Sequence, residues 1–135
     1  MRETIDVPVI EAYDSIMQRY GEAQAKVLAS VANQSLAQEG LSVPELPKSS
    51  DYRRASSELS KKGLKLMAAI VVLKPWKDKA TQDEHVDQIV FCDVVPGTLT
   101  ELEYRDAILR TQRYIDPKKA QFNICDFSKA EAPTA

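Results

Sequence analysis

Apolar side chains recur at helical spacing through the first third of the chain. Steps of three and four residues keep them on one face of a helix, and the phase continues past Gly21 without a slip. The apolar positions on this face are Val9, Tyr13, Ile16, Met17, Tyr20, Val27, Leu28 and Val31. Asp6 is placed to cap the helix and Gly40 to end it. The pattern predicts one long amphipathic helix within residues 1–40.

This predicted helix is long for the chain that carries it. About 30 helical residues span roughly 45 Å, whereas a domain of this size has a radius of gyration near 14 Å. The helix must therefore overhang, bend at Gly21 or pack on a second copy, and we expect a homo-oligomer. Leu102 and Leu109 add a second apolar stripe on a later helix. The candidate interface residues are Tyr13, Met17, Tyr20, Leu102 and Leu109.

The remaining pattern predicts a linker with two prolines over residues 41–50, then a short helix and three strands. The first two strands are apolar on both faces, as in central strands covered on two sides. The predicted elements are a helix over 50–62, strands over 64–73 and 86–95, a helix over 98–115 and a strand over 120–127. A helical crossover joins the last two strands, so they are expected to run parallel.

Together these elements predict a single α+β domain over residues 1–127. It consists of a long N-terminal amphipathic helix, a short basic helix, and then β-β-α-β in a small mixed sheet. Residues 128–135 are predicted to form a disordered tail. The composition fits an ordinary globular domain, because 44% of the 135 residues are hydrophobic and 28% are charged. Collagen-like and low-complexity classes are excluded.

The cysteines and the N-terminus point to the cytoplasm. Cys92 and Cys125 each lie in an apolar run, which favours two buried, reduced thiols over a disulfide framework. Acidic residues interrupt the first fourteen positions, where a signal peptide needs an apolar core. The longest apolar stretch, residues 66–73, is far shorter than a membrane span of about 18 residues. We therefore expect no membrane association.

The charge distribution adds a candidate ligand-binding segment. The formal net charge is −2, yet residues 48–80 carry 9 basic and 3 acidic side chains. Cations next to an aromatic ring suit phosphate neutralisation and base stacking. The candidate ligand-binding residues are Arg53, Arg54, Lys61, Lys62, Lys74, Trp76 and Lys77. The same pattern also fits a solvated basic face.

Signals for catalysis are weak. Asp83, His85 and Asp87 alternate, so an extended segment would place all three on one side, and these are ligand types that metals accept. No second histidine or distant ligand motif accompanies them. The chain has no Gly-x-Ser-x-Gly elbow, no P-loop and no dinucleotide fingerprint. No catalytic residue and no cofactor are therefore predicted.

Three functional hypotheses follow from these patterns. The first is a small non-catalytic binding protein, of regulator, inhibitor or immunity type, that acts through protein–protein contacts as a homo-oligomer. The second is binding of a nucleotide or of nucleic-acid phosphates by the basic segment 48–80, with an interaction that weakens as salt rises. The third is a metal or acid–base site at Asp83, His85 and Asp87.

Overall fold

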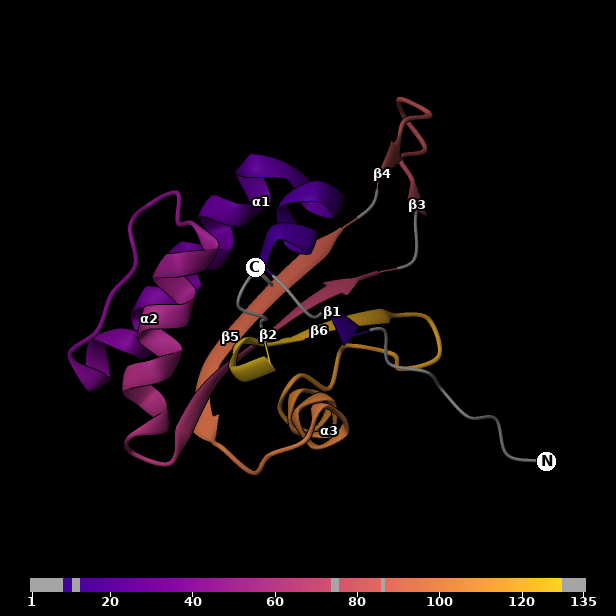
Figure 1. The fold of residues 1–135 in the computed structure, drawn as a ribbon. Coiled ribbons are helices and arrows are strands. Elements are labelled where there is room, and N and C mark those ends of the chain that lie inside the picture. Colours follow the sequence, from indigo (N-terminus) through magenta and orange to yellow (C-terminus); the bar gives the residue numbers. More distant parts are fainter. Residues whose placement is uncertain (1–8, 11–12, 74–75, 86, 130–135) are drawn as a thin grey trace.

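The computed structural model describes residues 9–10, 13–73, 76–85 and 87–129. Helices and a sheet pack together in this part of the chain, which confirms the α+β class (Figure 1). The helical elements are α1 (Tyr13–Leu36), η1 (Ala37–Glu39), α2 (Ser49–Ser60), α3 (Glu101–Thr111) and η2 (Phe127–Lys129). The strands are β1 (Val9–Ile10), β2 (Leu64–Val72), β3 (Trp76–Lys77), β4 (Glu84–His85), β5 (Gln88–Pro96) and β6 (Gln121–Asp126).

The main sheet has four strands in the order β1-β6-β2-β5, and β3 pairs with β4 in a separate hairpin. Strand β2 runs antiparallel to both of its neighbours, with Ala68 opposite Cys92 on β5 and opposite Cys125 on β6. Strands β5 and β6 are therefore parallel to each other, with β2 between them. Strand β1 runs parallel to β6 at the edge.

Both faces of the sheet are covered. Helices α1 and α2 lie on one face, where they pack against Leu66, Ala68 and Ile70 of β2. Helix α3 lies on the other face, against Met67 and Ala69. Because successive side chains of a strand point to opposite faces, β2 has to be apolar at nearly every position. This double burial explains its continuous apolar run.

The prediction of one unbroken N-terminal helix is wrong. Gly21 has φ 84° and ψ 178°, so α1 is two helical segments that meet at a kink. The kink rotates the buried face by about 100°, or one residue. The buried side chains after the kink are Ala25, Leu28, Ala29, Ala32 and Leu36. Val27, which an uninterrupted stripe would bury, is 46% exposed.

Other boundaries also differ from the prediction. Val9 and Ile10 form a strand beside β6 where a helix was expected. Both residues are β-branched, which suits a strand next to an open sheet edge. The segment between the first two predicted strands contains the β3–β4 hairpin, and α3 ends at Thr111, whereas the predicted helix continues to 115. Residues 127–129 form η2, whereas the rest of the predicted tail lies outside the described residues.

Candidate functional site

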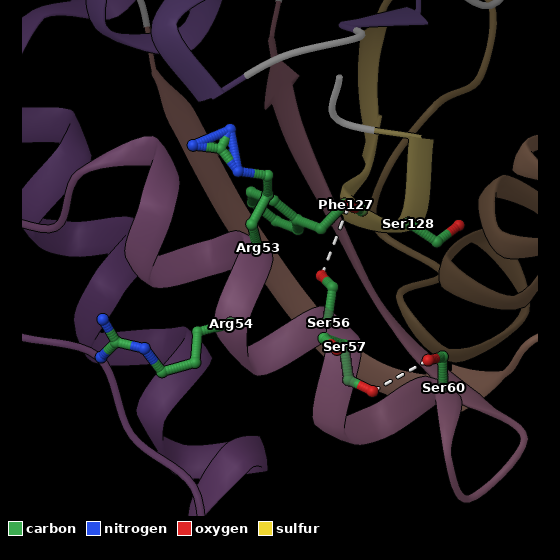
Figure 2. Close-up of a pocket in the computed structure, with 7 residues that line it drawn as sticks. All are labelled: Arg53, Arg54, Ser56, Ser57, Ser60, Phe127 and Ser128. Carbon is green, nitrogen blue, oxygen red and sulfur yellow. Dashed lines mark hydrogen bonds between the residues drawn. The ribbon is translucent and has the colours of Figure 1, made fainter. Parts of the chain in front are cut away.

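A pocket of about 440 Å³ lies between α2 and η2 (Figure 2). Its volume falls in the range of about 300–1,000 Å³ that small-molecule sites occupy. The lining residues are Arg53, Arg54, Ser56, Ser57, Ser60, Phe127 and Ser128. The lining residues are therefore two arginines, four serines and one phenylalanine, and none of these described residues is acidic.

Helix periodicity explains how α2 supplies one wall. Tyr52, Ala55 and Leu59 are buried against the core, which fixes the rotation of the helix. Positions 53, 57 and 60 follow the spacing of a single helical face, and that face is turned toward η2. The side chains of Arg53, Ser57 and Ser60 therefore line the pocket together (Figure 2).

Aromatic packing holds α2 and η2 together under the pocket. The Tyr52 ring stacks on the Phe127 ring with centroids 4.4 Å apart, and its other neighbour is Tyr13 at 4.7 Å. The Ser56 hydroxyl donates a hydrogen bond to the Phe127 carbonyl at 3.4 Å. These contacts connect the helix to the end of β6 across 71 positions of sequence.

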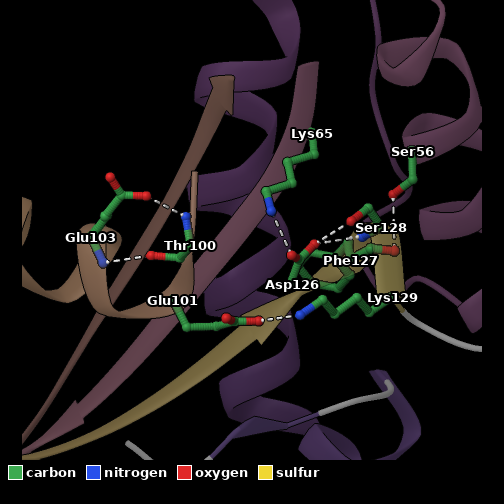
Figure 3. A network of polar contacts seen from close by, with 9 residues as sticks. All are labelled: Ser56, Lys65, Thr100, Glu101, Glu103, Asp126, Phe127, Ser128 and Lys129. Carbon is green, nitrogen blue, oxygen red and sulfur yellow. Dashed lines mark hydrogen bonds and ion pairs between the residues drawn. The ribbon is translucent and has the colours of Figure 1, made fainter. Parts of the chain in front are cut away.

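A buried ion pair positions Ser128, on the opposite wall. The Lys65 ammonium donates to Asp126 Oδ2 at 2.7 Å, with the two side chains 8% and 1% exposed. The Ser128 amide and hydroxyl donate to Asp126 Oδ1 at 2.9 and 2.6 Å (Figure 3). Burial raises the pKa of the Asp126 carboxyl, but the hydrogen bonds from Lys65 and Ser128 outweigh burial, so the pKa is lowered. A carboxylate with a lowered pKa is a weak base, which suits positioning of Ser128 better than removal of its proton.

The two arginines of the pocket differ in solvent exposure and in ion pairing. Arg54 is 4.0 Å from the Asp51 carboxylate and its side chain is 76% exposed. Arg53 is half-buried, and within the described ranges no carboxylate forms an ion pair with it. A half-buried guanidinium without a counter-ion attracts an anion more strongly than one that is exposed and paired. Of the two arginines, Arg53 is therefore better placed to attract an anion.

The structure does not bring the whole basic segment to one place. Lys61 pairs with Glu58 at 3.0 Å and Lys62 with Glu39 at 3.2 Å, and neither lines the pocket. Figure 1 shows the β3–β4 hairpin, which carries Trp76 and Lys77, projecting beyond the sheet on the side away from α2. The Trp76 side chain and Lys74 lie outside the described residues. A single site that joins the short helix to Trp76 has no support in this arrangement.

The candidate metal ligands lie on and beside the β3–β4 hairpin. Asp83 is exposed, and its carbonyl accepts a hydrogen bond from the Asp78 amide at 3.0 Å. The His85 side chain lies outside the described residues, and Asp87 follows β4. Across the described residues, no three histidine, cysteine, aspartate or glutamate side chains are grouped to hold a metal ion.

Most of the candidate interface residues belong to the core of the monomer. Tyr13 is 2% exposed and donates a hydrogen bond to the Met17 sulfur at 3.4 Å. Met17 and Tyr20 pack partly buried against the same core, and Leu109 packs against the α3 core. Leu102, at 54% exposed, is the candidate that presents most of its side chain to solvent.

A smaller hollow of about 270 Å³ lies between β5 and α3. The Tyr104 hydroxyl donates to Asp93 Oδ2 at 2.7 Å on its wall. Burial, and secondarily the Asp93 charge, raises the pKa of Tyr104. The remaining lining is formed mainly by Phe91, Ala107 and Ile108, without a cation. Because its one charged group already has a hydrogen-bond donor, this hollow offers less for recognition than the α2–η2 pocket.

Sequence reasoning found Arg53 and Arg54 but missed the rest of the pocket. The spacing of Ser57 and Ser60 relative to Arg53 is a readable signal, because all three fall on one helical face. Ser128 lies in the segment predicted to be a disordered tail, so no local pattern pointed to it. The Lys65–Asp126 pair joins two strands and is visible only in the folded chain.

Comparisons with known proteins add no family to this description. No protein-family model, no curated protein and no solved structure matches the chain. Within the described ranges, none of the helices has the length and apolar character that crossing a membrane requires.

Proposed function

We propose that the protein is a non-catalytic binding protein that holds a small phosphate-bearing ligand in the α2–η2 pocket. The observation that carries the proposal is Arg53, a half-buried guanidinium with no ion-pair partner among the described residues, set in a pocket walled by serine hydroxyls. Arginine presents a planar fork that matches two phosphate oxygens at once. Of the four serine hydroxyls, those of Ser56, Ser60 and Ser128 donate within the chain, which leaves the Ser57 hydroxyl to supply a further donor.

The size of the pocket and the pairing of nearby lysines favour a small ligand over a nucleic-acid strand. A binding surface for a strand needs a track of unpaired cations and stacking aromatics. Lys61 and Lys62 are paired with carboxylates, and the Trp76 hairpin lies away from α2 (Figure 1). A nucleotide or a sugar phosphate matches the volume of about 440 Å³.

The test is a titration with inorganic phosphate, pyrophosphate and adenosine monophosphate, followed by backbone amide chemical shifts. We expect saturable shifts at Ser57, Ser60 and Ser128 that weaken with added salt. Arg53→Ala removes a charge-assisted interaction of about 1.5–3 kcal/mol, which is about a tenfold to hundredfold loss of affinity. Arg53→Lys keeps the charge but loses the fork, so an intermediate loss is expected.

The matched control is Arg110→Ala, which removes the same charge from an exposed position in the last turn of α3. This variant is expected to bind the three probes as the parent chain does. Equal weakening by both substitutions would show a general charge effect without a site. The absence of saturable shifts with millimolar probe at low salt would refute the proposed function.

Protein–protein binding, the function that the sequence favoured, stands as the second candidate. Its support is a different observation, the outer edge of β5, where the described residues form no further strand. A cytoplasmic location is also proposed, since Cys92 and Cys125 are free and buried. They flank Ala68 on strands two places apart, so about 10 Å separates their backbones, too far for a disulfide.

A further inference from the structure

Strand β5 forms one edge of the sheet and lacks most of the usual protection of an edge. It is nine residues long and pairs with β2 without a bulge, from Leu64 opposite Pro96 to Val72 opposite Gln88. Natural edge strands are kept from pairing with other chains by lysines, internal prolines, bulges or short length. Its sequence, QIVFCDVVP, has no lysine and no internal proline.

The hydrogen-bond ladder identifies the backbone groups that face outward. The Leu73 amide donates to the Asp87 carbonyl and the Gly97 amide to the Gly63 carbonyl, both at 2.9 Å. Hydrogen-bonded pairs alternate along an antiparallel ladder, so odd-numbered residues of β5 bond to β2. The amides and carbonyls of Val90, Cys92 and Val94 therefore point away from the sheet.

One side chain of α1 reaches this edge. The Ser35 hydroxyl donates to the Cys92 carbonyl at 3.0 Å. Within the described ranges no other hydrogen bond satisfies the outward groups of Val90, Cys92 and Val94. Val31 and Val27 lie one and two turns before Ser35 on the same side of α1, and Val27 is 46% exposed. The open edge therefore has an apolar rim.

We propose that β5 pairs antiparallel with β5 of a second copy of this chain, joining two four-stranded sheets into one. Centring the twofold axis on Cys92 places Val90 opposite Val94 of the second copy. Asp93, the one charged residue of β5, then faces Phe91 of the second copy. Centring the axis on Asp93 would instead set two carboxylates opposite each other, which destabilises a strand pair.

The side chains of β5 favour pairing with a second copy of β5 over pairing with a strand of another protein. The edge offers no cation and one carboxylate, which already accepts the Tyr104 hydrogen bond. It therefore selects an uncharged, mostly apolar strand of matching length. Strand β5 of a second copy meets this description apart from Asp93, which already accepts the Tyr104 hydrogen bond, and isologous contacts of this kind are the commonest basis of homodimers.

The test is sedimentation velocity at micromolar concentrations, with substitutions that block the outward amides. The parent chain is expected to sediment with twice the monomer mass of 15.1 kDa. Val94→Pro removes an outward donor without breaking the β2–β5 ladder, because proline is tolerated where the N–H faces solvent. This variant is expected to be monomeric. Leu102→Glu, an exposed site on α3, is the control and is expected to remain dimeric.

Amide hydrogen exchange on the parent chain gives a second readout that needs no variant. Pairing predicts slow exchange at Val90, Cys92 and Val94, with protection that increases with protein concentration. The proposal is overturned if the parent chain sediments at the monomer mass throughout, which would leave β5 to a strand of another protein. It is also overturned if a folded Val94→Pro chain stays dimeric, or if these three amides exchange rapidly at every concentration. The phosphate titration reads the α2–η2 pocket, whose lining includes no residue of β5, so either proposal can fail alone.

Discussion

Replacing Lys65 with methionine should destabilise the fold strongly, because it leaves a buried charge without its partner. Lys65 and Asp126 are 2.7 Å apart, and their side chains are 8% and 1% exposed. Methionine keeps an unbranched stem, with a sulfur in place of Cδ, and removes the ammonium group. Removing one partner of a buried pair costs about 3–5 kcal/mol, a large share of a total stability of about 5–15 kcal/mol.

The assay is urea denaturation followed by circular dichroism, with Lys61→Met as the control. Lys61 pairs with Glu58 at 3.0 Å, but these side chains are 69% and 47% exposed. An exposed pair contributes about 0–1 kcal/mol, so burial is the main difference between the two experiments. The double variant Lys65→Met, Asp126→Asn should recover much of the loss, since neither charge remains and the asparagine oxygen still accepts from Ser128.

A loss below about 1 kcal/mol for Lys65→Met, equal to that of Lys61→Met, would refute this reasoning. It would mean that water reaches Asp126 and that the carboxylate does not depend on Lys65. Failure of the double variant to recover stability would indicate that the lysine stem and the packing around it, and not the charge, supply the stabilisation.

Three further predictions concern stability and reactivity. The pKa of Asp126 is lowered, so the ionised carboxylate stabilises the fold above the ordinary pKa of 3.8, and this stabilisation is lost as the pH falls below 3.8. Asp126→Asn should therefore flatten the acid side of a curve of stability against pH. An unchanged curve would contradict the pairing of Asp126 with Lys65. Cys92 and Cys125, whose thiols have raised pKa values because of burial, should react with a thiol reagent only after unfolding, and rapid labelling of the native chain would contradict their burial. Gly21→Ala should cost about 1–3 kcal/mol by thermal unfolding, although no atom lies within 4 Å of the added Cβ; an unchanged melting temperature would show that the kink is not required.

The sequence pattern predicted where helices and strands lie better than it predicted the break within the N-terminal helix. Strand β2 was readable because burial on both faces leaves an apolar run. The kink at Gly21 was not, because Val27 and Val31 happen to continue the stripe of Tyr13 and Ile16. The alanines that form the buried face after the kink carry little hydrophobic signal, so the rotation of that face escaped the pattern. Tertiary packing decided between two faces that the sequence left nearly equal.

The candidate site was predictable only where it is local. Arg53 and Arg54 stood out as charge on a short helix, and their helical face is fixed by Tyr52 and Leu59. The second wall comes from the end of β6, and its approach to α2 depends on the Tyr52–Phe127 stack. No periodicity within either segment encodes a contact across 71 positions. The same limit hid the pairing of Lys65 with Asp126.

The position of β2 between β5 and β6 also constrains the order in which the sheet assembles. Strand β5 follows β2 closely in the chain, whereas β6 is reached only after α3 has crossed over the sheet. During synthesis β2 can pair with β5 before β6 is made. The β6-facing edge of β2 then stays open, and the Lys65 ammonium has not yet met Asp126. Unpaired strand edges make partly folded chains prone to aggregation. The interval before β6 docks is therefore the stage at which the nascent chain exposes both edges of the β2–β5 pair to other chains.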